Sequence, residues 1–294
     1  MSILIQLFYN GLIAGAIYAL VAAGFSLIYS TNKFVHFAHG SAIAFSAYIT
    51  YWLFSVIGLD FTLAVILTIC FSAMFGMVMH YLVYLPLRRR HASPLILLTA
   101  GVALSILFES LILLLFGADV KTIGLIKVEK GLEIFGAIIT PLQIVIVITS
   151  FALLIALWFL MKKTKIGKAM RAVADNKEVA EICGISSNMI FAVSFAIGSI
   201  IAGIAGILVA LEQNLEPVMG TNLMIKGFTG AIVGGVGSVP GAILGAFILG
   251  FAENFGIWFL PSGYKDAIAF VILFAFLLFR PQGLLGIKKQ GEKQ

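Results

Sequence analysis

Lysine, arginine, aspartate and glutamate are so sparse in this chain that long stretches contain none of them. Residues 1–32 have none, and uncharged stretches of 26, 27 and 28 residues cover 34–59, 61–87 and 134–161. Another stretch, 182–211, has 30 residues. A membrane-spanning helix needs about 20 mostly apolar residues. We therefore expect the chain to cross a lipid bilayer several times as helices.

The composition excludes two other classes of protein. The 294 residues are 61% hydrophobic and 11% charged, whereas soluble globular domains are about 45–50% apolar and about 25% charged. So few charged residues could not cover the surface of a soluble globule of this size. The 25 phenylalanines, eight tyrosines and three tryptophans are not typical of a disordered chain. A polytopic helical membrane protein, with one transmembrane domain over residues 1–294, remains.

The sequence offers no constellation for catalysis or metal binding. Its two cysteines, Cys70 and Cys183, form neither a disulfide framework nor a zinc pattern, and the four histidines are scattered. No phosphate-binding G-x-x-x-x-G-K-[ST] loop occurs, so ATP hydrolysis by that route is excluded. We therefore expect this chain to be no enzyme, with no catalytic residue, no metal and no cofactor.

Four further apolar segments complete the count. Pro94–Gly117 is interrupted only by Glu109, and the C-terminal third holds 223–237, 239–260 and 267–279. We predict an all-α bundle of eight or nine membrane segments. The number depends on whether 223–237 crosses the bilayer or only enters it.

Glycines cluster in the C-terminal third, where eight of the 30 fall within residues 227–250. Small residues let lipid-embedded helices approach closely, so tight helix packing is one reading of this cluster. The other is a broken or re-entrant segment near 223–241 whose freed backbone groups line a solute route. We place the break at Gly237, Pro240 and Gly241, because proline removes a backbone donor and glycine tolerates positive φ.

Basic residues indicate which ends of the segments face the cytoplasm. With the N-terminus outside and nine crossings, 14 lysines and arginines fall inside and four outside. The inside set is Lys33, Arg88–Arg90, the six basic residues of 162–177 and the four of 280–293, and the outside set is Lys121, Lys127, Lys130 and Lys265. We therefore expect the loop 162–188 and the tail 281–294 on the cytoplasmic side of a bacterial-type plasma membrane.

Five polar residues in the apolar segments are candidates for a translocation pathway: His39, Glu109, Lys226, Glu253 and Asn254. Ionisable groups inside membranes are costly and usually face the bundle interior, where they would suit a charged or zwitterionic solute. The alternative is a structural ion pair such as Lys226 with Glu253, or a side chain that snorkels to the interface. His36 and His39 stand three apart, which suggests one helical face near the interface, but two ligands are too few for a metal site.

The loop 162–188 is the only long segment expected in the cytoplasm. Its spacing predicts an amphipathic helix over Lys168–Glu181, with Gly184 as the C-terminal cap. Such a helix could rest on the membrane surface or dock into a groove of a cytoplasmic partner. Glu178-x-Ala180-x-x-x-Gly184 favours docking, because it is a degenerate form of the E-A-A-x-x-x-G loop that ABC importer permeases present to their ATPase subunits.

With these motifs together, the sequence resembles the integral-membrane permease subunits of branched-chain amino-acid ABC importers, specifically their H-type subunit. The resemblance runs from the first span to the tail. The matching motifs are Phe37-Ala38-His39-Gly40, Gly167-x-Ala169-x-Arg171-Ala172 continuing to Ala180-x-x-x-Gly184-Ile185, Lys226-Gly227-Phe228-Thr229, Gly234-Gly235-Val236-Gly237-Ser238-Val239-Pro240-Gly241 and Pro281-x-Gly283-x-x-Gly286. One position departs from the family: His36 stands where the family usually has asparagine.

The resemblance implies an alternating-access transporter with several subunits. A second, similar permease would pair with this chain, two cytoplasmic ATPases would bind ATP and power the pair, and an extracytoplasmic binding protein would deliver branched-chain amino acids. The carried-over coupling positions are Arg171, Asp175, Glu178, Ala180 and Gly184. Importers of urea and short-chain amides share this permease type and stay open as an alternative. A second alternative is a stand-alone secondary transporter with an intramembrane Glu/Lys relay.

Overall fold

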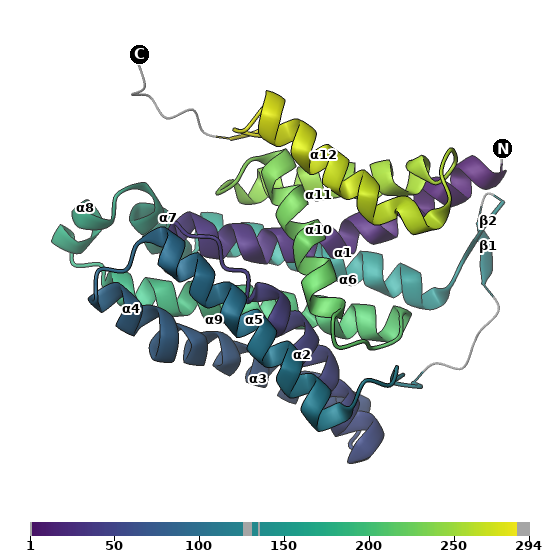
Figure 1. Cartoon of the computed structure of the whole chain (residues 1–294), viewed down its shortest axis with the longest axis horizontal. Helices are drawn as coiled ribbons and strands as arrows, with labels where there is room; N and C mark the ends of the chain where they lie inside the picture. The colour runs from purple at the N-terminus through teal and green to yellow at the C-terminus, as the bar shows by residue number, and fades with distance from the viewer. Residues whose placement is uncertain (1, 126–130, 135, 287–294) are drawn as a thin grey trace.

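The computed structural model describes residues 2–125, 131–134 and 136–286 (Figure 1). The described chain is mostly helical, with one short hairpin, which confirms the all-α prediction. The helices are α1 (Ser2–Asn32), α2 (His39–Tyr51), α3 (Phe61–Met79), α4 (Leu85–Arg89), α5 (Pro94–Phe116), α6 (Pro141–Lys163), α7 (Lys165–Asp175), α8 (Lys177–Ile182), α9 (Ser187–Glu212), α10 (Met219–Gly234), α11 (Val239–Gly256) and α12 (Lys265–Phe279). Two π-helical turns, Trp52–Val56 and His80–Tyr84, extend α2 and join α3 to α4, and a 3₁₀ turn, Ser262–Tyr264, precedes α12.

Seven helical segments of the described chain are long and apolar enough to cross a bilayer. They correspond to seven of the nine predicted segments. The other two, 34–59 and 223–237, contain the shorter helices α2 and α10. Helix α2 and its π-helical extension together have a length of about 27 Å, and α10 has a length of about 24 Å, at 1.5 Å per residue. Helix α11, which is among the seven, also has 18 residues, so length alone does not set α2 and its extension apart, and the crossing of 34–59 and 223–237 stays a prediction.

Local capping determines where several of these helices begin. Ser93 caps α5 ahead of Pro94, and the Asp60 carboxylate accepts hydrogen bonds from the first turn of α3. Thr140 and Gln143 form a reciprocal capping box at the start of α6, with Pro141 in its first turn.

The predicted segment 134–161 begins too early, because α6 starts only at Pro141. Ahead of α6, the strands β1 (Leu132–Ile134) and β2 (Ala137–Ile139) form a short antiparallel hairpin, with Gly136 at positive φ between them. The apolar strand residues extended the uncharged run and concealed the hairpin.

Helix α1 lies at the centre of the bundle and packs against α6, α9, α10 and α11. Its most apolar window is 89% buried, compared with 72% for α9, 17% for α5 and 6% for α12. The sequence explains this position, because α1 carries no charged residue and many alanines and glycines. Gly15 on α1 and Gly250 on α11 bring the two backbones into contact. Close packing of this kind replaces the hydrophobic effect as the source of attraction between helices in lipid.

The glycine cluster of the C-terminal third produces a second close contact, between α10 and α11. A Cβ atom added to Gly234 would collide with the carbonyl of Gly241, and one added to Gly245 would collide with the backbone of α10. The packing reading of this cluster is thus correct for these glycines. Residues 283–286 then return to the end of α10, where the amides of Leu284 and Leu285 donate to the carbonyls of Val233 and Gly234 at 2.9 and 2.8 Å.

The two ends of the bundle carry different elements (Figure 1). The N-terminus and the β1–β2 hairpin lie at one end, whereas α4, α7, α8 and the C-terminal end of the described chain lie at the other. The basic residues assigned to the inside in the sequence analysis, as far as the structure describes them, therefore gather at one end. Lys127, Lys130, Lys288, Lys289 and Lys293 lie outside the described residues.

Candidate functional site

The loop expected to meet an ATPase forms two short helices at the end of the bundle that carries the basic residues. The sequence predicted one helix over Lys168–Glu181, and this was wrong. Asn176 has an extended backbone, ends α7 and begins α8, where its side chain accepts from the amides of Glu178 and Val179 at 3.0 and 3.1 Å. Asparagine competes with a helix for backbone hydrogen bonds and favours caps, which accounts for the break.

Helix α8 ends in a Schellman motif. The Gly184 amide donates to the Glu181 carbonyl at 2.9 Å, and the Ile185 amide donates to the Ala180 carbonyl at 3.0 Å. Gly184 has φ +82°, and nothing lies within 4 Å of the position that a Cβ atom would occupy. The conformation, and not the space, therefore requires glycine at this position.

The five predicted coupling residues divide into one anchor and four exposed groups. Ala180 is buried against the bundle, whereas Arg171, Asp175, Glu178 and Gly184 are exposed. Large apolar side chains are also exposed on α8, with Val179 and Ile182 at 54% and 85%. Apolar groups rimmed by charges at a surface are typical of a protein–protein contact. The α7–α8 element thus has the character of a docking surface.

A second arrangement lies inside the bundle, around Lys226. The Lys226 Nζ lies 3.2 Å from Glu253 Oε2 and 3.0 Å from Asp266 Oδ1, and it also lies 3.1 Å from the Tyr18 hydroxyl. Tyr18 donates to the same Glu253 oxygen at 2.8 Å. The Glu253 side chain is fully buried, and its other oxygen has no hydrogen-bond partner among the described residues. The predicted ion pair between Lys226 and Glu253 is thus present, and Tyr18 and Asp266 also contact Lys226.

This polar cluster borders a cavity of about 410 Å³ between α1, α10 and the segment that follows α9. Lys226, Tyr18, Asp266 and Asn222 are among the residues that line it. Gln213, Asn214 and Glu216 add polar groups, and the remaining lining is apolar. The cavity therefore offers both signs of charge next to an apolar surface.

The other predicted pathway residues do not all join this cluster. Asn254 neighbours Glu253 on α11, and its Oδ1 accepts from Lys265 at 3.2 Å. Glu109 accepts a hydrogen bond from Thr221 at 3.2 Å, a partner that the sequence did not indicate. His39 is fully buried, and its ring packs against Gly24 of α1.

The expectation that His36 and His39 share one helical face was wrong. His36 precedes α2, so the pair does not share a helical face. Both histidines are buried within the protein, at 1% and 0% exposure. The chain folds back after α1 as an irregular segment, and the His36 Nδ1 meets the Tyr84 hydroxyl at 2.8 Å. Irregular backbone at membrane depth is tolerated where it is buried in protein.

Comparison with known proteins identifies the family. A sequence model described as "Branched-chain amino acid transport system / permease component" matches residues 7–277. The chain belongs to this permease family. It is 33% identical to the high-affinity branched-chain amino acid transport system permease protein BraD of Pseudomonas aeruginosa over 96% of this chain and 95% of that protein. It is 31% identical to the corresponding LivH of Escherichia coli over the same shares, and 28% identical to a probable LivH of Methanocaldococcus jannaschii over 91% of this chain and 88% of that one.

Of the three residues at which we predicted a backbone break, only Gly237 lies in the turn between α10 and α11. Gly235 and Gly237 have positive φ, and Ser238 caps α11 through the amide of Gly241 at 3.3 Å. Pro240 and Gly241 lie in the first turn of α11 and not in the turn between the helices. Proline is well suited to that position because the first amides of a helix have no intrahelical acceptor.

Sequence reasoning missed three polar residues that the structure places in buried or clustered contacts. Tyr18 looked like one aromatic residue in an apolar run, and Asp266 looked like a loop residue. Arg88 was counted as a loop charge, yet it ends the long α3–α4 segment and clamps the end of α1. Its guanidinium donates to the Asn32 carbonyl and Oδ1 at 2.8 and 3.0 Å and lies 4.2 Å from the centre of the Phe191 ring. No local signal marked Arg88, because its partner Asn32 is 56 residues away in the sequence.

Proposed function

We propose that this permease is the transmembrane subunit of an ATP-binding-cassette importer that moves branched-chain amino acids into the cell by alternating access. The observation that carries the proposal is the family match over residues 7–277, combined with an α7–α8 element that leaves the apolar side chains of Val179 and Ile182 exposed. An element of this kind serves a membrane protein that is driven by a separate subunit. ATP would be bound and hydrolysed on that subunit.

The proposed orientation places α7, α8 and the C-terminus in the cytoplasm and the N-terminus outside. The gathering of basic residues at one end supports it, because short cytoplasmic loops carry an excess of lysine and arginine. Nine membrane segments, with α2 and α10 as the two short ones, fit this orientation. The partners would be a second homologous permease, two cytoplasmic ATPases and an extracytoplasmic binding protein.

The solute route is proposed to include the cavity beside Lys226. An α-amino acid is a zwitterion with an apolar side chain, and this cavity combines carboxylates, an ammonium group and an apolar wall. The three closest oxygens around the Lys226 Nζ already occupy its donors. Glu216, and the Asp266 carboxylate that stays 70% exposed although it pairs with Lys226, would contact the ammonium group of the solute.

Reconstitution in proteoliposomes tests the proposal. We expect uptake of labelled leucine, isoleucine or valine only when the second permease, the ATPases, the binding protein and ATP are all present. Uptake of urea or acetamide in place of leucine would favour the alternative importer class. Uptake by this chain alone, driven by an ion gradient, would establish a secondary transporter and contradict the proposal.

Substitution of Gly184 tests the docking element. Valine should cost about 1–2 kcal/mol in the left-handed conformation and loosen the end of α8, so ATP-driven uptake should fall severalfold while the amount of inserted protein stays the same. Asparagine tolerates this conformation and should retain most uptake. The measurement is uptake together with transport-coupled ATP hydrolysis. Equal activity of G184V and the unsubstituted protein would exclude α8 as the coupling element.

A further inference from the structure

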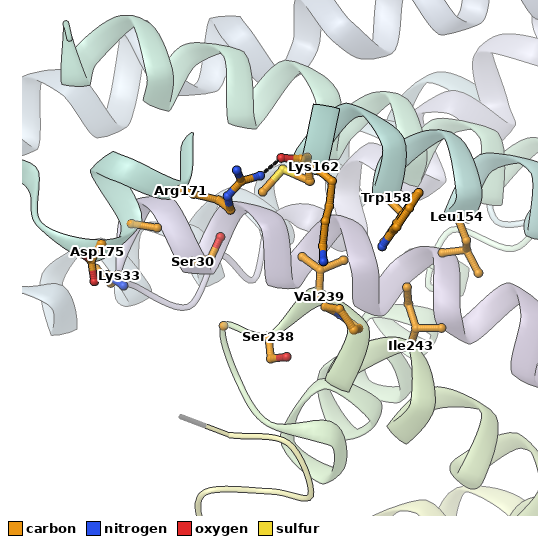
Figure 2. A pocket seen from close by; sticks show the side chains of 14 residues that line it. Ser30, Lys33, Leu154, Trp158, Lys162, Arg171, Asp175, Ser238, Val239 and Ile243 are labelled. Carbon is orange, nitrogen blue, oxygen red and sulfur yellow. Dashed lines mark hydrogen bonds between the residues drawn. The ribbon is translucent and has the colours of Figure 1, made fainter. Parts of the chain in front are cut away.

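A cavity of about 450 Å³ lies beside the docking element, between α6, α7, the end of α1 and the start of α11 (Figure 2). Its wall is formed largely by apolar residues of α6 and α11, including Leu154, Trp158 and Ile243. The solute cavity beside Lys226 shares none of these residues. The function proposed above therefore leaves this groove unassigned.

The groove is apolar at one end and charged at the other. Leu154 and Ile243 lie together at one end of the view in Figure 2, and Lys33 and Asp175 lie at the opposite end. Lys162 extends from α6 near the middle of the view, between Trp158 and Arg171, and the Arg171 guanidinium donates to the Met161 carbonyl of α6. Leu154 and Lys162 are separated by eight residues of α6, which corresponds to about 12 Å along the helix. Basic residues outnumber acidic ones in the lining, with Lys33, Lys162 and Arg171 against Asp175.

Two observations connect the groove to the lipid phase. The neighbouring face of α6 exposes large apolar side chains, with Ile155 at 64% and Phe159 at 55%, and in a membrane such a face contacts acyl chains. Trp158 lies on the groove, is 50% exposed and has Lys162 Nζ 5.9 Å from its ring centre. Tryptophan and lysine in this combination are typical of the level at which hydrocarbon meets head groups.

We propose that this groove binds one anionic phospholipid of the inner leaflet, with its phosphate at Lys162 and Arg171 and an acyl chain along Trp158, Leu154 and Ile243. The excess of basic groups at one end and the apolar wall at the other match such a molecule in both charge and shape. The assignment to the inner leaflet rests on the proposed orientation of α7 and α8. A bound lipid would contact α7 directly and would therefore lie against the element that meets the ATPase.

Fluorescence quenching in vesicles tests the lipid site without any requirement for transport. The variant W52F/W258F keeps Trp158 as the only tryptophan of the chain. It is reconstituted with dibrominated phosphatidylglycerol or dibrominated phosphatidylcholine at increasing mole fractions. We expect phosphatidylglycerol to quench Trp158 at a severalfold lower mole fraction, because each basic residue near the surface contributes about fivefold to the binding of an anionic lipid.

The adjacent lysines provide a matched pair of variants. K162Q should reduce the preference for phosphatidylglycerol about fivefold, whereas K163Q, which removes an equal charge from an exposed residue outside the groove, should leave it unchanged. Equal quenching by the two lipids before any lysine is replaced would overturn the proposal, since contact would then be non-specific. Absence of quenching by either lipid would also overturn it, because another part of the assembly would then fill the groove. A failure of uptake with normal quenching would count against the proposed function and not against the lipid site.

Discussion

The G234A variant is expected to lose most of its folded, assembled protein. The added methyl group would collide with the Gly241 carbonyl and the Ala242 amide nitrogen, and these are backbone atoms that no change of side-chain rotamer can move. Helices α10 and α11 would have to separate, and overpacking of this kind costs about 1–3 kcal/mol and sometimes more. The measurement is the melting temperature and the monodisperse yield in detergent.

A matched glycine elsewhere supplies the control for this experiment. Gly263 has nothing within 4 Å of the position of an added Cβ atom, and its φ lies outside the left-handed region. G263A should therefore behave like the unsubstituted protein. If G234A melted at the same temperature as G263A, the two helices would not be in contact at Gly234 and the packing described for α10 and α11 would be incorrect.

The second large effect is expected from K226M. Removing Lys226 leaves the carboxylate of Glu253 fully buried with Tyr18 as its remaining close partner, and loss of one partner from a buried ion pair costs about 3–5 kcal/mol. The double variant K226M/E253Q removes the stranded charge and should regain most of that loss. K121M, which breaks a pair with the exposed Asp119, should cost less than about 1 kcal/mol.

The same variants separate a structural role of Lys226 from a role in transport. If the polar cluster lines the solute route, K226M/E253Q should be stable yet transport-deficient. If the cluster only holds α10, α11 and α12 together, stability and uptake should return together. A double variant as unstable as K226M would show that Lys226 and Glu253 are not energetically coupled, which would contradict the geometry of the pair.

Much of the bundle could be predicted because a membrane helix can be recognised from the composition of its own stretch of sequence. An uncharged stretch of sufficient length has few other outcomes in lipid, and α1, α5 and α9 follow their stretches closely. The α7–α8 element was partly predictable for a similar reason, since its motif is short and continuous. The division of this element into α7 and α8 at Asn176 depends on one side chain, because asparagine favours a cap position over a helix interior. The spacing of apolar residues does not reveal that preference.

The polar cluster illustrates what a sequence pattern cannot supply. Tyr18 and Glu253 are 235 residues apart, and their pairing depends on α1 lying against α11. Small residues on α1 allow close packing but do not specify which helix packs there. The burial of His36 likewise depends on a segment that folds back into the bundle to reach Tyr84. A reading limited to segment lengths counts His36 as the start of a span and does not indicate the irregular backbone that brings it to Tyr84. Both the Tyr18–Glu253 pairing and the burial of His36 depend on contacts between segments that are distant in the sequence.

The central position of α1 has a consequence for the order of assembly. Its closest neighbours α9, α10 and α11 lie far along the chain, so α1 leaves the ribosome long before they do. At a synthesis rate of about 5–20 residues per second, the delay before α11 emerges is roughly ten to fifty seconds. During that interval the small-residue grooves of α1 face lipid or the insertion machinery, and a chain truncated before α9 would never close them.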